Sequence, residues 1–176
     1  LVKVHATTVN RTDCANLTAK PFIMRFVLGF FVPKQPILGT DFAGVVEAVG
    51  QGVSRFAVGD RVFGFNDMGA ASQATHMRIN EADLFPIPGE LGFTKAAASL
   101  EGAHYAYSFI HKVELRPGQR VLVNGATGAI GSALLQLLKP FDVHLSATCR
   151  AKHKPLVREM SSSINLKILK LNQLSF

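Results

Sequence analysis

The sequence predicts an α/β protein with a β-rich first part, followed by an incomplete doubly wound unit in which helices connect parallel strands. Three observations predict this class. Short apolar runs punctuated by glycine fill the first half of the chain, and a strand, a glycine turn and a helix follow one another from Arg120 to Lys139. The alternation of Val143, Leu145 and Ala147 with polar residues then indicates a second strand.

The composition is that of a globular protein, and its charge is unevenly distributed. The chain has 176 residues, 48% of them apolar, which is enough for one sizeable domain or for one domain and part of another. Its net charge is +7, but residues 143–176 carry six Lys and Arg against one acidic residue, whereas residues 1–142 are nearly balanced. Because the basicity belongs to the tail, we expect no nucleic-acid partner.

Cysteine usage and hydropathy point to a cytoplasmic protein that does not enter membranes. Cys14 and Cys149 are far apart and give neither a disulfide framework nor a zinc pattern. The apolar stretch from Pro21 to Pro33 contains Arg25 and is shorter than the roughly 20 residues that span a bilayer. The chain begins at Leu1, inside an alternating run, so we expect a fragment.

The first half reads as a small, tightly turned β-barrel. Strands are expected over Leu1–Val9, Ile37–Gly50, Val58–Gly64, Thr75–Asn80 and Leu84–Ile87. Asn10–Asp13 reads as a polar turn after the first strand, where site residues often lie. Residues 20–36 hold four phenylalanines, which fit either the wall of an apolar pocket or a short segment covering the core. A helix is expected over Phe93–Lys112, with Thr94 as its N-cap.

The glycine turn carries the strongest functional signal. Gly125, Gly128 and Gly131 are spaced three apart, and the helix after them ends before Pro140. The buried face of that helix is indicated by Ile130, Ala133, Leu134, Leu137 and Leu138. Such a turn lets backbone amides and the helix dipole hold a diphosphate, although a glycine turn also serves simply to join a strand to a helix.

The residues after the second strand favour NADPH over NADH. NAD-preferring units carry an acidic residue about 20 positions after the glycines. There is no Asp or Glu from Val143 to Arg158, whereas Arg150 and Lys152 stand just past the strand, where a 2′-phosphate lies in such units. The alternative is that Arg150 and Lys152 are ordinary solvated charges.

Together these motifs resemble the medium-chain dehydrogenase/reductase superfamily, and within it the zinc-free quinone oxidoreductase (zeta-crystallin-like) branch. The matching stretches, in the family's order, are Val9–Asp13, Leu38–Gly44, Val58–Val62 and Gly118–Gly131 with Gln136 and Lys139. The resemblance implies a GroES-like catalytic domain over residues 1–92, a linking helix and turn over 93–117, and a partial Rossmann domain over 118–176. It also implies a homodimer.

The resemblance implies hydride transfer from NADPH, bound between the two domains, to a quinone or an enone. By position, Asn10 matches an asparagine near the nicotinamide and substrate, with Asp13 in the same turn. Tyr105 stands near a family threonine, and His76 stands where many relatives carry tyrosine, as a structural histidine or as a proton donor. The residues expected to hold the cofactor are Gly125, Ala126, Thr127, Gly128, Ala129, Ile130, Gly131, Arg150 and Lys152.

No metal site is expected. Zinc-using relatives have Cys where Asn10 stands and His where Thr40 stands, and both replacements are poor zinc ligands. The runner-up activity is that of a zinc-type alcohol dehydrogenase of the same superfamily. A further alternative is a non-catalytic remnant or binding module.

The tail departs from the family. From about Ser161 onward the sequence lacks the expected Gly-Ala-Asp turn and third strand, as a truncated or frame-shifted reading would explain. We therefore expect a two-strand sheet with an open apolar edge, which the apolar residues of the tail from Ile164 to Leu174 cover in part at most, without rebuilding the pocket. We also expect a chain that is weakly active or inactive by itself.

Overall fold

The chain forms two compact units, Leu1–Leu100 and Glu101–Phe176, in the computed structural model. The described residues are 1–19, 22–23, 26, 29, 36–66, 71–161 and 166–169. Most of the phenylalanine-rich segment at residues 20–36 lies outside them, so both interpretations of it, as a pocket wall or as a segment covering the core, fall outside the described residues.

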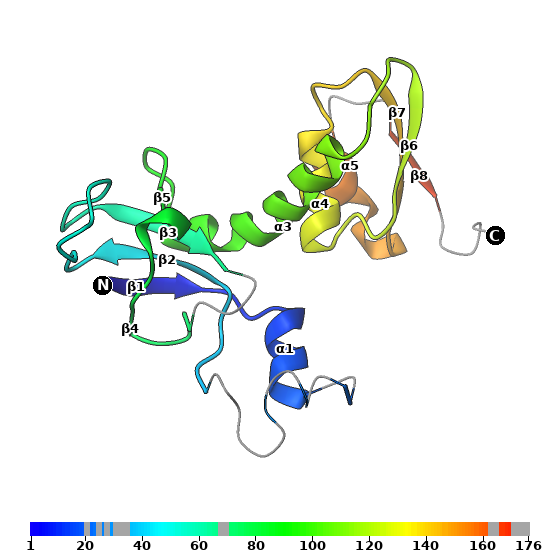
Figure 1. Cartoon of the computed structure of the whole chain (residues 1–176). Helices are drawn as coiled ribbons and strands as arrows, with labels where there is room; N and C mark the ends of the chain where they lie inside the picture. Colours follow the sequence, from blue (N-terminus) through cyan, green and yellow to red (C-terminus); the bar gives the residue numbers. More distant parts are fainter. Residues whose placement is uncertain are drawn as a thin grey trace. The chain divides into compact units, whose positions relative to one another are not determined.

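The first unit is built on a five-stranded antiparallel sheet with the strand order β4-β1-β2-β3-β5 (Figure 1). Its strands are β1 (Val2–Thr7), β2 (Asp41–Val46), β3 (Arg61–Phe65), β4 (His76–Met77) and β5 (Phe85–Pro86). A 3-10 turn, η1 (Glu81–Asp83), precedes β5. Each predicted strand is present but shorter than predicted. Apolar side chains from these strands, including Val2, Phe42 and Val62, form a buried cluster.

A helix stands where the sequence predicted only a polar turn. Helix α1 (Arg11–Thr18) begins directly after Asn10. The side chain of Asn10 accepts a hydrogen bond from the backbone N–H of Asp13, and the Asp13 carboxylate accepts one from the N–H of Asn10. This reciprocal pair is a capping box with an aspartate at its third position, so the polar residues start a helix.

Helix α3 (Phe93–His111) agrees with the predicted helix to within one residue at its end. The expected N-cap, Thr94, lies inside the helix, so that prediction is wrong. Phe93 is its first residue, and the side chain of Phe93 is packed there: its ring stacks on His5 at 4.6 Å between centroids, and the Arg61 guanidinium lies 5.0 Å from its centroid.

The second unit is a three-stranded parallel sheet with the order β6-β7-β8 and helices packed against it (Figure 1). Its elements are β6 (Gln119–Val123), α4 (Ala129–Leu137), β7 (Val143–Thr148), the 3-10 turn η2 (Ala151–His153), α5 (Lys154–Met160) and β8 (Leu166–Leu169). Leu135 from α4 and Val157 from α5 are buried against Val123 and Leu145 of the sheet. The predicted strand, glycine turn, helix and strand are confirmed.

The expected two-strand sheet is wrong, because part of the atypical tail forms a third strand. β8 pairs in parallel with β7, and Leu145 lies opposite Leu166. Leu166 and Ile168 pack against the buried cluster while Lys167 is exposed. This alternation of apolar and charged residues is that of a half-buried strand.

In the part of the chain that the structure describes, no helix is long and apolar enough to cross a membrane.

Candidate functional site

The glycine turn lies between the end of β6 and the start of α4. Gly125 has a φ of +76°, which favours glycine, and a Cβ added there would meet nothing within 4 Å. Gly131 is needed for a different reason. A Cβ on Gly131 would lie 2.3 Å from the carbonyl oxygen of Gly125, so only glycine lets the first turn of α4 pack against the loop.

The start of α4 presents unpaired backbone amides. Gly128 is its N-cap, without a side-chain capping bond. Within the described residues, the N–H groups of Thr127, Ala129 and Ile130 donate to no other residue. Free amides at a helix N-terminus, together with the helix dipole, favour a bound anion. The open side of Gly125 leaves room for one, so these residues fit a diphosphate.

The end of β7 is bonded to this turn. The N–H of Gly125 donates to the Thr148 hydroxyl at 3.0 Å, and the N–H of Ala126 donates to the Thr148 carbonyl at 2.9 Å. Arg150 follows two residues later as the N-cap of η2, and Lys152 lies in that turn. Both side chains are exposed, and neither forms an ion pair with any described residue. Two cationic side chains, Arg150 and Lys152, therefore follow the end of β7, which is hydrogen-bonded to the glycine turn.

Asn10 and Asp13 lie together in the first unit, joined by the capping box. The other oxygen of the Asp13 carboxylate accepts a hydrogen bond from the N–H of Gly39 at 2.9 Å. Asp13 is 2% exposed, so this carboxylate ties the start of α1 to the segment that leads into β2.

The amide nitrogen of Asn10 is engaged as well. It donates to the Thr40 hydroxyl at 2.6 Å, and the Thr40 hydroxyl donates to the Asp41 carboxylate at 3.0 Å. The Thr8 hydroxyl donates to the same carboxylate oxygen at 2.8 Å. Thr40 and Asp41 are each 1% exposed. Asn10, which is half-buried, thus forms a hydrogen-bonded cluster with the buried residues Thr40 and Asp41. The predicted role of Asn10 near a substrate stays a prediction.

The structure does not bring His76 near Asn10. His76 pairs with Lys3 at the start of β1, whereas Asn10 follows the end of β1, so the strand's length of about 20 Å separates them. The His76 ring lies 2.9 Å from the Glu47 carboxylate and 3.2 Å from the Thr75 hydroxyl. These contacts favour the structural interpretation of His76. Tyr105 lies on the part of α3 in the second unit, half-buried beside the His104 ring.

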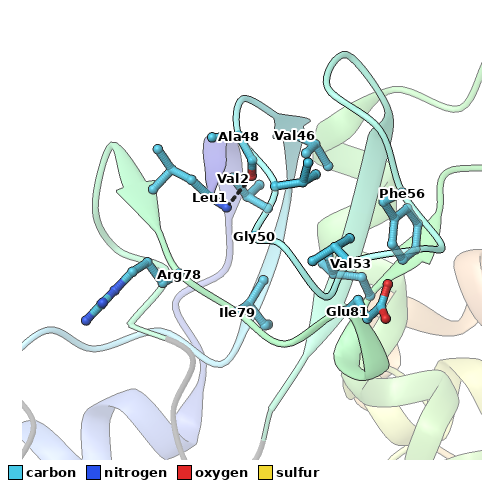
Figure 2. Close-up of a pocket in the computed structure, with 12 residues that line it drawn as sticks. Leu1, Val2, Val46, Ala48, Gly50, Val53, Phe56, Arg78, Ile79 and Glu81 are labelled. Carbon is cyan, nitrogen blue, oxygen red and sulfur yellow. Dashed lines mark hydrogen bonds between the residues drawn. The ribbon is translucent and has the colours of Figure 1, made fainter.

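A pocket of about 260 Å³ lies in the first unit, and Figure 2 shows its lining. Leu1 and Val2 line it, which places it at the start of β1 and away from Asn10. The Glu81 carboxylate accepts hydrogen bonds from the N–H groups of Ser54 and Arg55 and so fixes a loop beside the pocket. Among the described residues, no group of three or more His, Cys, Asp or Glu is placed to hold a metal ion.

Comparison with known proteins identifies the family. Residues 1–117 match the alcohol dehydrogenase GroES-like domain. The chain belongs to this family. Quinone oxidoreductases among its relatives place it in the quinone oxidoreductase branch of the medium-chain dehydrogenase/reductase superfamily, as the resemblance implied. The predicted fold class, a GroES-like part followed by an incomplete Rossmann unit, is confirmed.

Two curated relatives illustrate the range of the family. Rat quinone oxidoreductase is 32% identical over 155 residues, which cover 84% of this chain and 43% of the rat enzyme. Mycoketide-CoA synthase of Mycobacterium tuberculosis is 40% identical over 123 residues, covering 69% of this chain and 3% of the synthase. The chain therefore spans less than half of each of these relatives.

Two solved structures share the fold. Quinone oxidoreductase of Escherichia coli, complexed with NADPH, has a TM-score of 0.74 at 22% identity. The match covers 99% of this chain and 50% of the Escherichia coli chain. CurK enoyl reductase has a TM-score of 0.82 at 21% identity, covering 95% of this chain and 50% of its own.

Residues that were not predicted as site residues contact both the glycine turn and Asn10. Thr148 holds the glycine turn, and Thr8, Thr40 and Asp41 surround Asn10. Sequence reasoning missed Thr148 because it lies 23 residues after Gly125 and belongs to no motif.

Proposed function

We propose that this chain is part of an NADPH-dependent oxidoreductase that transfers hydride to a quinone or to the activated double bond of an enone without a metal. The observation that carries the proposal is the bond between the glycine turn and Thr148, which joins the free amides to the strand end that Arg150 and Lys152 follow. The nicotinamide supplies the hydride when the cofactor is bound. The names of the relatives support both substrate classes.

In this proposal, different groups of the chain bind different parts of the cofactor. The amides of Thr127, Ala129 and Ile130 hold the diphosphate, and Gly131 lets the first turn of α4, which carries two of these amides, pack against the Gly125 loop. Arg150 and Lys152 pair with the 2′-phosphate that distinguishes NADPH from NADH. A hydrogen bond between charged groups contributes about 1.5–3 kcal/mol, so NADPH binds at least several-fold more tightly than NADH.

Fluorescence titration of the 176-residue chain with NADPH and with NADH tests this assignment. Arg150→Ala should lower the affinity for NADPH and leave that for NADH nearly unchanged. Lys95→Ala, which removes an exposed cation in the first unit, is the matched control. Equal affinities of the wild type for the two nucleotides would refute the NADPH preference.

The metal-free part of the proposal rests on the cluster around Asn10. Asn10 and Thr40 stand where zinc-using relatives carry Cys and His, and the two side chains bond each other at 2.6 Å. Neither is a good zinc ligand. Elemental analysis of protein purified without a metal-binding tag should find no stoichiometric zinc. One zinc per chain would support the zinc-type alcohol dehydrogenase instead.

The activity of the whole protein is a proposal too, because the chain spans 43% of the rat enzyme. NADPH oxidation with a simple quinone and with a simple enone should be measured on this chain and on a version extended by the rat enzyme's C-terminal part. We expect turnover from the extended version and little from the short chain. Turnover of about 1–1000 per second by the short chain would refute that expectation. NADPH binding without turnover in both versions would favour a binding module.

The remaining proposals concern the cellular compartment, the binding partners and the oligomeric state. The protein is proposed to lie in the cytoplasm and to bind neither nucleic acid nor membranes. The small-molecule substrate is supported by the name of the rat relative, quinone oxidoreductase. A homodimer is proposed from the family, and analytical ultracentrifugation tests it.

A further inference from the structure

Thr148 holds three consecutive residues of the glycine turn. Its carbonyl accepts from the N–H of Ala126, its hydroxyl oxygen accepts from the N–H of Gly125, and the same hydroxyl lies 2.5 Å from the side-chain oxygen of Asn124. Thr148 is 1% exposed, so its hydroxyl is buried while the side chain of Asn124 that it bonds is exposed. The side chain of Asn124 is thus fixed to the end of β7.

The direction of these bonds sets which end of the Asn124 amide faces outward. A threonine hydroxyl has one proton. Because the oxygen already accepts from Gly125, that proton is donated to the side-chain oxygen of Asn124. The amide nitrogen, with its two N–H donors, is then turned away from Thr148. Asn124 is exposed, and its amide nitrogen donates to no residue in the described part of the chain.

These donors lie at the same edge of the sheet as the free amides. Asn124 directly follows β6 and precedes Gly125, so it lies at the carboxyl end of the strand, where ligands of open α/β sheets bind. Four groups at this turn therefore offer N–H donors that no described residue accepts: the Asn124 amide nitrogen and the backbone N–H groups of Thr127, Ala129 and Ile130. Donors of this kind suit the oxygens of a nucleoside diphosphate.

We propose that Asn124 binds the dinucleotide through its side-chain nitrogen, and that Thr148 is the positioning residue that turns this nitrogen outward. The inference rests on the proposed function. The contact is to the diphosphate and the ribose next to it, which NADPH, NADH and ADP share. It therefore sets the affinity for all three, whereas Arg150 and Lys152 set the preference among them.

Asn124→Asp is the first test. An aspartate has the same shape and still accepts from Thr148, but it replaces both N–H donors with a carboxylate oxygen. The affinities for NADPH, NADH and ADP should each fall about tenfold or more, with the ratio of NADPH to NADH affinity unchanged. The matched control is Gln119→Glu at the other end of β6. Gln119 is exposed, its side-chain oxygen accepts from the N–H of Arg116, and glutamate keeps that bond.

A double-mutant cycle tests the positioning role. Thr148→Val replaces the hydroxyl with a methyl group, which removes the bonds to Asn124 and to the N–H of Gly125. It should weaken binding of ADP, and Thr148→Ser should restore it. In the Thr148→Val background the amide is free to turn, so Asn124→Asp should then cost several-fold less affinity than in the wild type. Loss of stability alone does not produce this coupling, and thermal unfolding of each variant shows that it is folded.

The outcomes separate the two proposals. If the wild type binds NADPH, NADH and ADP but Asn124→Asp binds them equally well, the role of Asn124 is refuted and the proposed function stands. If the effects of Asn124→Asp and Thr148→Val simply multiply, the positioning role of Thr148 is refuted. If the wild type binds none of the three, the proposed function fails, and this contact fails with it.

Discussion

The cluster around Asn10 and the turn around Gly125 are both rich in polar groups, and they use them in opposite ways. In the first, the side chains of Asn10, Asp13, Thr40 and Asp41 bond to one another or to nearby backbone, and three of the four are at most 2% exposed. In the second, the backbone N–H groups of Thr127, Ala129 and Ile130 have no acceptor among the described residues, and the space beside Gly125 is open. Satisfied, buried groups hold a fold together, whereas unsatisfied, exposed donors are available to a ligand.

Asp13→Ala should have the largest effect on stability. It leaves the N–H groups of Asn10 and Gly39 without their acceptor, and a buried donor left unpaired costs about 1–3 kcal/mol. We expect the free energy of unfolding to fall by about 3 kcal/mol, measured by urea denaturation followed by circular dichroism. Glu90→Ala, at an exposed residue, is the control. A loss below about 1 kcal/mol would show that the cluster is not a structural tie.

Gly131→Ala is the corresponding change at the turn, with Gly128→Ala as its control. A Cβ on Gly131 would lie 2.3 Å from the Gly125 carbonyl oxygen, whereas one on Gly128 would lie 3.4 Å from the same atom. Because backbone must shift in the first case, we expect a loss of about 1–3 kcal/mol and weaker NADPH binding. The control should lose less than about 1 kcal/mol. Equal losses at the two glycines would contradict the packing argument.

Thr40→Val separates packing from hydrogen bonding in the first cluster. The shape is kept, but the acceptor for Asn10 and the donor to Asp41 are both removed. We expect a loss of about 1–2 kcal/mol, restored by Thr40→Ser, in the same denaturation experiment. A neutral effect of Thr40→Val would mean that the hydroxyl is free to serve a ligand, which would make the two regions more alike.

The smallest effect concerns pH. Hydrogen bonds from the backbone N–H groups of Arg55 and Ser54 hold the pKa of Glu81 below its ordinary value. A lowered folded-state pKa contributes stability that is present above the unfolded pKa, about 4.3, and is lost as pH falls through the folded value. Stability measured from pH 6 to pH 3 should therefore decline less in Glu81→Gln than in the wild type. Identical pH profiles would exclude this contribution.

The sequence by itself determined the elements whose signals are local. The glycines at 125, 128 and 131, the apolar face that follows them and the alternation after Asp142 predicted the strand, turn, helix and strand that the second unit contains. The capping box at Asn10 and Asp13 is just as local, and helix α1 could have been predicted from it. The alternation of Leu166, Lys167 and Ile168 is local too, and strand β8 could have been predicted from it without reference to the family.

Only the tertiary structure decided which distant residues meet. Asn10 bonds Thr40 across 30 positions, and Gly125 bonds Thr148 across 23. Hydrophobic periodicity fixes which side of an element is buried, but not which polar side chain at the end of one strand lies opposite a given backbone group on another. Strand order and register make that choice: pairing β6 with β7 from Gln119 and Val143 onward brings Thr148 level with the turn after Val123. A hydrogen bond requires alignment to within a few tenths of an ångström, and only the assembled sheet provides it.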